Sequence, residues 1–260
     1  MMEKVGILLV SFGTTVSGAH QLTVKMIKDK IAKEYPACMV CEAWTSKWII
    51  KRIYETTGKR INTVAEALKE MIQLGIREVY IQPTYIINGI ENTVMKEAAE
   101  MYRGQLKNLV FGDPLLTSPK DFDEIVRFVQ RRYADVKEDE AVILMGHGSK
   151  HASNEAYQQL DKMLRVDKRQ KIYLCTMGAE CVLKVLLQEF RKWNIRKIYL
   201  VPFLFTAARH AIEDMAGEKE TSWKSICQKA GYEVECSMKG LGEYPEVQKM
   251  IVQHLQNIIE

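Results

Sequence analysis

Residues 5–15 read VGILLVSFGTT and residues 141–150 read AVILMGHGSK. Each segment is an apolar run of strand length that stops at a turn containing glycine, which is typical of a buried strand of a parallel sheet. Further along, residues 76–83 (IREVYIQP) match residues 195–202 (IRKIYLVP). The chain therefore repeats its own pattern, and we interpret it as one scaffold that is used twice.

Only the second copy carries metal-binding side chains at the turns that follow its strands. These side chains are His147, Glu180 and His210, and the aligned residues of the first copy are Phe12, Ser46 and Glu91. Two imidazoles and a carboxylate are ligands that divalent transition metals accept in proteins. The repeat therefore predicts a divalent-metal site in the second half.

Short apolar runs alternate with longer amphipathic stretches along the whole chain, which predicts right-handed βαβ units and parallel sheets. The predicted strands are residues 5–10, 38–43, 78–82, 109–111, 141–145, 171–175, 197–201 and 233–237. The predicted helices are residues 21–34, 63–74, 93–103, 122–133, 154–164, 182–193, 223–230 and 245–258. We therefore predict an α/β protein of two similar domains with a cleft between them, each domain being a four-stranded parallel sheet flanked by helices.

A chain of 260 residues is long enough for two domains of about 125 residues each. Residues 135–140 (DVKEDE) form a short charged stretch that we interpret as the linker. We place an N-terminal domain without the metal ligands at 1–137 and a C-terminal domain with the metal site at 138–260. The C-terminal helix is left free to pack back on the first domain.

Composition excludes several functional classes. Hydrophobic residues make up 47% of the chain and charged residues 27%, as in ordinary globular proteins. The net charge of +4 is spread along the chain, which argues against a nucleic-acid partner and is compatible with an anionic small ligand. No segment reaches the ~20 apolar residues of a membrane span, and the start MMEKVGILLVSFG does not resemble a signal peptide, so we expect a cytoplasmic protein.

Familiar nucleotide and hydrolase motifs are missing from the sequence. It contains no G-x-S-x-G, no G-x-x-x-x-G-K-[ST] and no G-x-G-x-x-G. The pair Cys38 and Cys41 is the only C-x-x-C, and no second pair stands at zinc-ribbon spacing. We interpret these cysteines as apolar filler with free thiols.

Ligands of open α/β sheets bind beyond the carboxyl ends of the strands. His147 follows the first predicted strand of the second half, Glu180 follows the second, and His210 follows the third after the loop 202–209. We therefore expect the three side chains to open onto one edge of the sheet, facing the cleft.

Each of these residues has a competing interpretation. His147 stands between two glycines, which expose an imidazole on a sharp turn, but a turn histidine needs no chemistry. Asp214 is the i+4 neighbour of His210 and is placed to orient its ring; an ordinary carboxylate in a first helical turn is the alternative. Glu180 is supported as a metal ligand only by its position at the edge of the sheet where we expect the ligand to bind.

Five further residues are candidates for binding the ligand, namely Phe12, Tyr85, Glu91, Lys150 and Arg209. Aromatic residues are usually core but also line flat apolar slots, and cations near strand ends meet carboxylates or simply solvent. The remaining histidines His20 and His254 lie on amphipathic helices, and we interpret them as surface residues.

Several segments resemble a known family. MGHGSKHASNEAYQQLD (residues 145–161), RHAIEDMAGEKETSWK (209–224) and KGLGEYP (239–245) resemble the anaerobic sirohydrochlorin cobaltochelatases, the CbiK type of class II chelatase. In the first half VSFGTT, IINGIE and GDPLLTS resemble the same family, so the resemblance runs from about Val5 to about His254.

The resemblance implies a chelatase that inserts Co2+ into sirohydrochlorin, or its precorrin form, on the oxygen-independent route to cobalamin. The tetrapyrrole would lie in the cleft, and the metal, which is a substrate, would be bound by His147, Glu180 and His210. These are the residues that the repeat singles out. No ATP or other nucleotide is expected.

Other readings stay open from sequence alone. The same scaffold could insert Fe2+, Ni2+ or Zn2+, into sirohydrochlorin or a haem-related porphyrin, because this ligand set accepts each of these metals. A non-catalytic carrier of tetrapyrrole or metal is an alternative of another class. The sequence also leaves open a homo-oligomer and the identity of the group that accepts the pyrrole protons.

Overall fold

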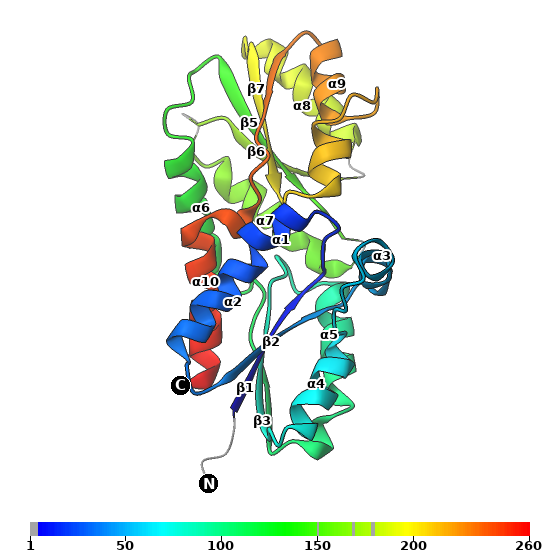
Figure 1. Cartoon of the computed structure of the whole chain (residues 1–260). Coiled ribbons are helices and arrows are strands. Elements are labelled where there is room, and N and C mark those ends of the chain that lie inside the picture. The colour runs from blue at the N-terminus through cyan, green and yellow to red at the C-terminus, as the bar shows by residue number, and fades with distance from the viewer. Residues whose placement is uncertain (1–4, 150, 168–169, 178–179) are drawn as a thin grey trace. The chain divides into compact units, whose positions relative to one another are not determined.

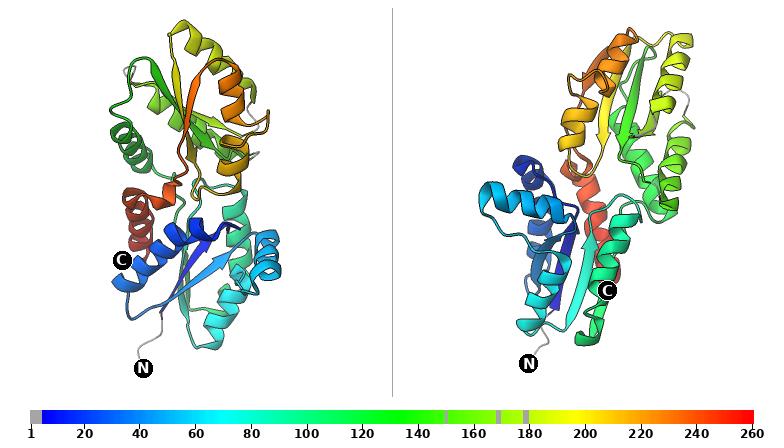
Figure 2. Two further views of the ribbon diagram at one scale, coloured as in Figure 1. Left: turned by 45° about the horizontal axis from the view of Figure 1, so that its top comes forward. Right: turned by 90° about the vertical axis from the view of Figure 1, so that its right-hand side faces the viewer.

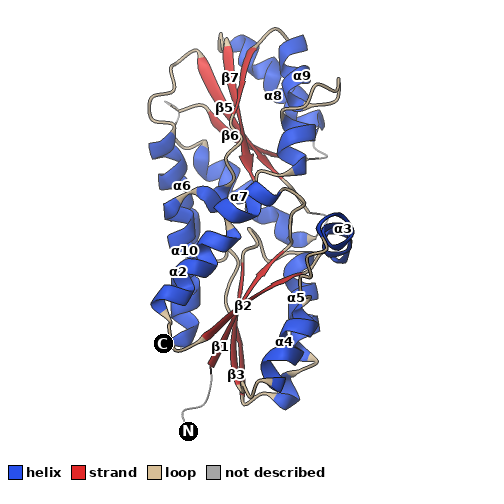
Figure 3. Ribbon diagram, viewed as in Figure 1, coloured by secondary structure: helices blue, strands red, loops and turns tan. Residues whose placement is uncertain are grey.

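The computed structural model describes residues 5–149, 151–167, 170–177 and 180–260. Two four-stranded parallel sheets, each flanked by helices, organise the described chain (Figures 1 and 3). The strand orders are β2-β1-β3-β4 in the first sheet and β6-β5-β7-β8 in the second. The predicted fold class of two similar parallel α/β sheets is confirmed.

All eight predicted strands are present, with ends within two residues of the prediction. They are β1 (Val5–Ser11), β2 (Met39–Trp44), β3 (Glu78–Pro83), β4 (Asn108–Phe111), β5 (Glu140–Gly146), β6 (Ile172–Thr176), β7 (Lys197–Phe203) and β8 (Glu233–Cys236). Strands β1 and β5 are buried almost throughout because each lies between two other strands and is covered on both faces.

The helices agree with the prediction with two exceptions. They are α1 (Ser17–Leu22), α2 (Val24–Glu34), α3 (Lys47–Thr57), α4 (Val64–Gln73), α5 (Ile90–Glu100), α6 (Pro119–Arg132), α7 (Glu155–Leu164), α8 (Glu180–Lys192), α9 (Trp223–Lys229) and α10 (Pro245–Ile259). The single helix predicted over 21–34 is two helices, because the backbone breaks at the buried residue Thr23, whose hydroxyl donates to the Ala19 carbonyl at 2.6 Å.

Helix α3 was not predicted. It begins after Ser46, whose side chain accepts from the Ile49 N–H, and ends at Gly58 in the left-handed region with φ of 69°. Ile49 is its one fully buried residue.

The contacts between its residues divide the chain into two compact units. The first consists of Met1–Thr117 and Gly242–Glu260, and the second of Ser118–Leu241. These boundaries differ from the predicted division at 137/138, because α6 belongs to the second unit. Helix α10 belongs to the first unit, as the prediction allowed. The predicted linker 135–140 lies inside the second unit, where Glu140 already begins β5.

Side-chain hydrogen bonds fasten α10 to the first unit. The Lys30 ammonium donates to Gln248 Oε1 at 2.6 Å, and the Gln248 amide donates to the Gly242 carbonyl at 2.7 Å. His254 lies 3.0 Å from the Asp113 carbonyl through Nδ1 and is only 9% exposed. The interpretation of His254 as a surface residue is therefore wrong.

In the first unit, α4 and α5 cover one face of the sheet and α2 and α10 the other (Figures 1 and 2). Leu8 and Val10 of β1 pack with Leu68 and Met71 of α4 in one apolar cluster. In the second unit, the equivalent cluster joins β5 to residues of α8 and α9, with Phe190 fully buried. Burial of such a side chain contributes about 2–3 kcal/mol, so each sheet is stabilised mainly by its helical layers.

The strand order fixes where a ligand can bind. In the second sheet the chain leaves β5 toward β6 on one side, then returns to β7 on the other side of β5. The loops that follow β5 and β7 therefore diverge, and a crevice opens between them at the carboxyl edge. The first sheet has the same order, with β1 and β3 in the corresponding places.

Within the described ranges, no helix combines the length and the apolar character that crossing a bilayer requires.

A substitution at Gly13, in the turn after β1, tests how tightly that turn is packed. Its φ is +97°, and a Cβ there would lie 2.6 Å from the Trp44 ring. We expect Gly13→Ala to lower the free energy of unfolding by about 2–3 kcal/mol, measured by urea denaturation. Gly58→Ala is the matched control, because φ is also positive (+69°) but the space is open; it should cost only about 1 kcal/mol. Equal costs would contradict the tight contact with Trp44.

Candidate metal centre

Two histidines meet at the crevice of the second sheet. Gly146 of β5 lies beside Phe203 of β7 in the parallel register, so the segments that follow these strands begin side by side. His147 comes directly after β5, and His210 opens a π-helical turn (His210–Met215) after β7. Their ring centroids are 5.2 Å apart and the ring planes make an angle of 72°.

The hydrogen bonds of both imidazoles leave the same nitrogen free. Nδ1 of His147 lies 3.0 Å from the Gly148 carbonyl, and Nδ1 of His210 lies 2.6 Å from Asp214 Oδ2. A carbonyl and an ionised carboxylate can only accept, so Nδ1 carries the proton in each ring. The Nε2 lone pair of each histidine is therefore available to a metal, an arrangement that is common among histidine ligands.

The separation of the rings suits a shared metal ion. With metal–nitrogen bonds of about 2.0–2.1 Å and tetrahedral angles, two imidazoles on one ion have centroids about 5 Å apart. The observed 5.2 Å agrees with that value. The separation of the two rings is thus compatible with both imidazoles binding one divalent ion.

The turn that presents His147 depends on its glycine. Gly148 has φ of +77°, and a Cβ there would lie 2.9 Å from Cβ of Thr176. The Ser149 N–H donates to Asn154 Oδ1 at 2.9 Å, which fixes the loop against the start of α7. Only glycine accepts both this backbone angle and this approach to β6.

His210 is held by the turn that it begins. Ala211 and Met215 are fully buried and anchor the turn in the core, whereas Ile212 is 47% exposed. The wider π-helical turn leaves Ile212 outside the core, since it changes which residues face inward. The predicted contact between His210 and Asp214 is confirmed.

The third predicted ligand, Glu180, is the first residue of α8, and its side chain lies outside what the structure describes. Lys150 also lies outside the described residues. Within the described parts of the chain, no three His, Cys, Asp or Glu side chains gather as a complete metal site. The described centre therefore consists of two imidazoles, with α8 starting beyond the carboxyl end of β6.

Arg209 forms an ion pair with Glu213, Nε to Oε1 at 3.1 Å, and its side chain is 63% exposed. The carboxylate therefore partly neutralises the guanidinium that we predicted to bind the ligand. Because the pair is exposed and joined by a single contact, it offers little resistance to exchange for another carboxylate.

Three predicted ligand-binding residues belong to the first unit. Phe12 directly follows β1 and is 48% exposed. Tyr85 is buried in the core, where its hydroxyl lies 3.0 Å from Thr45 Oγ1 and burial raises its pKa, so little of its ring can reach a ligand. Glu91 is half-buried in the first turn of α5.

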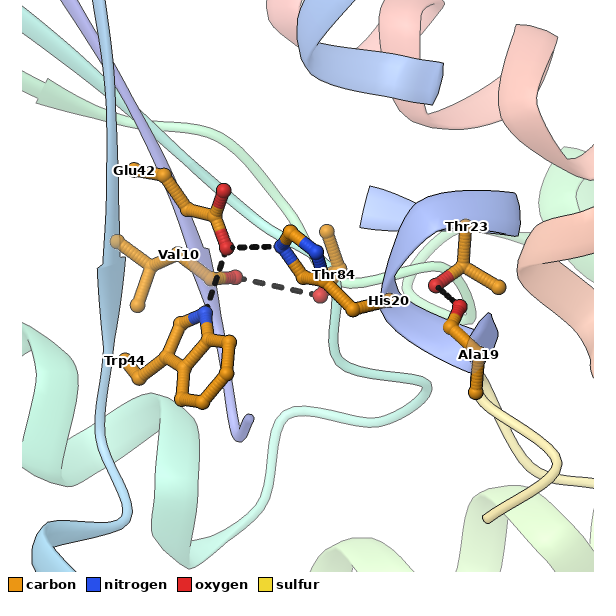
Figure 4. A network of polar contacts seen from close by, with 7 residues as sticks. All are labelled: Val10, Ala19, His20, Thr23, Glu42, Trp44 and Thr84. Atoms are coloured by element: carbon orange, nitrogen blue, oxygen red, sulfur yellow. Dashed lines mark hydrogen bonds and ion pairs between the residues drawn. The ribbon is translucent and has the colours of Figure 1, made fainter. Parts of the chain in front are cut away.

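A buried polar cluster in the first unit was missed by sequence reasoning (Figure 4). Glu42 Oε1 lies 2.7 Å from Nε2 of His20 and accepts from the Trp44 indole N–H at 2.6 Å. Burial raises the pKa of Glu42, but the hydrogen bonds from His20 and Trp44 and the charges of His20 and Lys28 outweigh burial and lower it. The side chain of His20 is only 12% exposed, so its interpretation as a surface residue is wrong. The partners come from α1 and β2, and no local motif connects them.

Solved structures share this architecture. SirB from Bacillus subtilis with Fe3+ superposes with a TM-score of 0.65 at 14% identity, covering 98% of this chain and 95% of that one. CbiX, described as the terminal enzyme of sirohaem biosynthesis in denitrifying bacteria, gives a TM-score of 0.56 at 13% identity, covering 97% and 98%. At such identities the likeness concerns the fold, which is that of the class II chelatases.

Sequence comparison identifies the family within that class. The cobalt chelatase (CbiK) family matches residues 5–260, and the chain belongs to this family. The sirohydrochlorin cobaltochelatase of Salmonella typhimurium is 29% identical over 256 residues, covering 98% of this chain and 97% of the relative. The sirohydrochlorin cobaltochelatase CbiKC of Nitratidesulfovibrio vulgaris is 31% identical over 260 residues, covering 98% and 90%. The resemblance drawn from the sequence motifs is confirmed.

Replacing Asp214 tests whether its carboxylate orients the ring of His210 for metal binding. We expect Asp214→Ala to weaken Co2+ binding by about 10- to 100-fold, because the ring of His210 loses the acceptor that orients it. Titration calorimetry with Co2+ alone measures the affinity. Glu213→Gln, in the same turn but paired with Arg209, should leave the affinity nearly unchanged. Equal effects of both variants would show that Asp214 does not act through His210.

Proposed function

We propose that this chain is a sirohydrochlorin cobaltochelatase that inserts Co2+ at the centre formed by His147 and His210, without ATP. The observation that carries the proposal is the pair of imidazoles with centroids 5.2 Å apart and both Nε2 atoms free. Membership of the cobalt chelatase family supports the reaction, and the names of the two relatives support the macrocycle.

The reaction requires a metal donor, a held macrocycle and a proton acceptor. Each metal insertion releases two protons from pyrrole nitrogens as the ion leaves the protein for the ring. In our proposal the Nε2 atoms of His147 and His210 hold Co2+ before transfer. As the metal leaves, each Nε2 lone pair becomes free to accept a proton, so the ligands of the substrate metal also serve as bases.

Asp214 supports both parts of this cycle. Its carboxylate fixes the ring of His210 while the metal is bound. After transfer, the same carboxylate stabilises the imidazolium that forms when Nε2 takes a proton. The Gly148 carbonyl does the same for His147 with a neutral acceptor.

Glu180 is proposed as the third ligand and as a proton relay. The support is its place at the first residue of α8, directly beyond the strand that pairs with β5 on the side opposite β7. For the macrocycle, we propose that Arg209 and Lys150 meet its carboxylates. Cobalt is favoured over other divalent metals by the family and not by the imidazoles, which bind several.

The proposal is tested by replacing His210. We expect His210→Ala to lower the rate of Co2+ insertion into sirohydrochlorin by at least about a hundredfold, because the variant loses one metal ligand and one base. Anaerobic absorbance of the macrocycle follows the reaction. Ile212→Ala is the control, since it changes an exposed side chain of the same turn. A His210→Ala variant that folds, by circular dichroism, and works at the wild-type rate would remove His210 from the mechanism.

A further inference from the structure

The first unit contains a groove that the metal centre does not explain. It lies between α3, the loop 58–63 and α4, and its volume is about 620 Å³. That volume is within the usual range for sites that bind small molecules. Ile50 and Ile61 give the groove an apolar lining, and the half-exposed Tyr54 borders it. We call it the α3–α4 groove.

Cations outnumber carboxylates along this groove. Lys47, Lys51, Arg60 and Lys69 line it, against two carboxylates. Lys51 forms an ion pair with Glu55, with Nζ 3.8 Å from Oε1. The other three cations form no ion pair with any residue that the structure describes. With four cations against two carboxylates, the groove carries an excess of positive charge around its apolar lining.

The two carboxylates of the groove already accept hydrogen bonds from Asn62 and Thr63, which precede α4. Glu66 accepts from the Thr63 N–H at 2.8 Å and from the Thr63 hydroxyl at 2.7 Å, as the capping box of α4. Glu70 accepts from the Asn62 amide at 2.7 Å. Both carboxylates keep their negative charge, but neither forms an ion pair with Lys47, Arg60 or Lys69.

The groove is preformed. Gly58 ends α3 in the left-handed conformation. The backbone N–H of Trp44 donates to the Asn62 carbonyl at 2.9 Å, which fixes the loop to β2. The capping box then sets the start of α4. A ligand would therefore not need to order these backbone segments, so less of the binding free energy is lost on ordering.

We propose that the α3–α4 groove is a second binding site for the carboxylate-rich tetrapyrrole, additional to the metal centre. The identity of the ligand rests on the proposed function. Its apolar ring system would lie against Ile50 and Ile61, and its carboxylates would pair with Lys47, Arg60 and Lys69. The site would retain substrate or product on the enzyme between turnovers. An inorganic anion fits less well, because it leaves the apolar lining unused.

The experiment uses the full chain with isotope-labelled isoleucine methyl groups and uroporphyrin, a carboxylate-rich porphyrin, as the probe. We expect saturable shifts of the Ile50 and Ile61 resonances, which report this groove separately from the metal centre. The dissociation constant obtained from these shifts should rise by about tenfold in the double variant Arg60→Glu with Lys69→Glu. Added salt should also weaken binding to the wild-type protein. Circular dichroism checks that the variant folds.

Matched charge reversals elsewhere in the first unit provide the control. Lys33→Glu with Lys249→Glu changes two exposed lysines of α2 and α10 and should leave the dissociation constant within about twofold. The milder Arg60→Gln with Lys69→Gln should weaken binding by about threefold and covers the case in which charge reversal unfolds the protein. Absence of saturable Ile50 and Ile61 shifts, or equal affinity in the groove and control variants, would overturn the proposal.

The outcome is independent of the outcome for cobalt insertion. A protein that inserts cobalt but shows no shift at Ile50 or Ile61 loses only the groove site. A protein that shows these shifts but never inserts cobalt keeps a tetrapyrrole site and loses the proposed reaction.

Discussion

The parallel pairing of β5 with β7 is the constraint on which the metal centre depends. Its register places Gly146 beside Phe203, and the strand order makes the loops after these two strands diverge at that point. His147 and His210 occupy those loops, so their meeting is a consequence of sheet topology. The first sheet repeats the topology with Phe12 at the corresponding turn, and there the same crevice edge carries an aromatic ring without metal affinity.

The hydrogen-bond acceptors around the two imidazoles decide which ring nitrogen is free to bind a metal. Two different acceptors, a backbone carbonyl and the Asp214 carboxylate, select the same tautomer and leave the same nitrogen free. Gly148 makes the first of these contacts attainable because its turn lies against Thr176. A substrate metal must be bound and then released, and an exposed pair of imidazoles meets both needs better than a closed set of four ligands.

The sequence predicts the fold well because the central strands β1 and β5 are continuous apolar runs, as is typical of buried parallel strands. It predicts the meeting of His147, His210 and Asp214 because strand ends and i, i+4 spacing are local signals. It does not reveal α3, which buries little beyond Ile49, nor the contact of His20 with Glu42, whose partners are distant in the chain. The sequence allows α10 to pack on the first unit but does not reveal that α6 belongs to the second, since an amphipathic helix does not specify which sheet it covers.

X-ray absorption of the Co2+-loaded protein tests the central claim most directly, because the extended fine structure reports the imidazole ligands of the metal itself. Our account predicts about two imidazoles per Co2+ at metal–nitrogen distances near 2.1 Å, and one imidazole when either His147 or His210 is replaced by alanine. A spectrum with only oxygen ligands, or one that neither substitution changes, would contradict it.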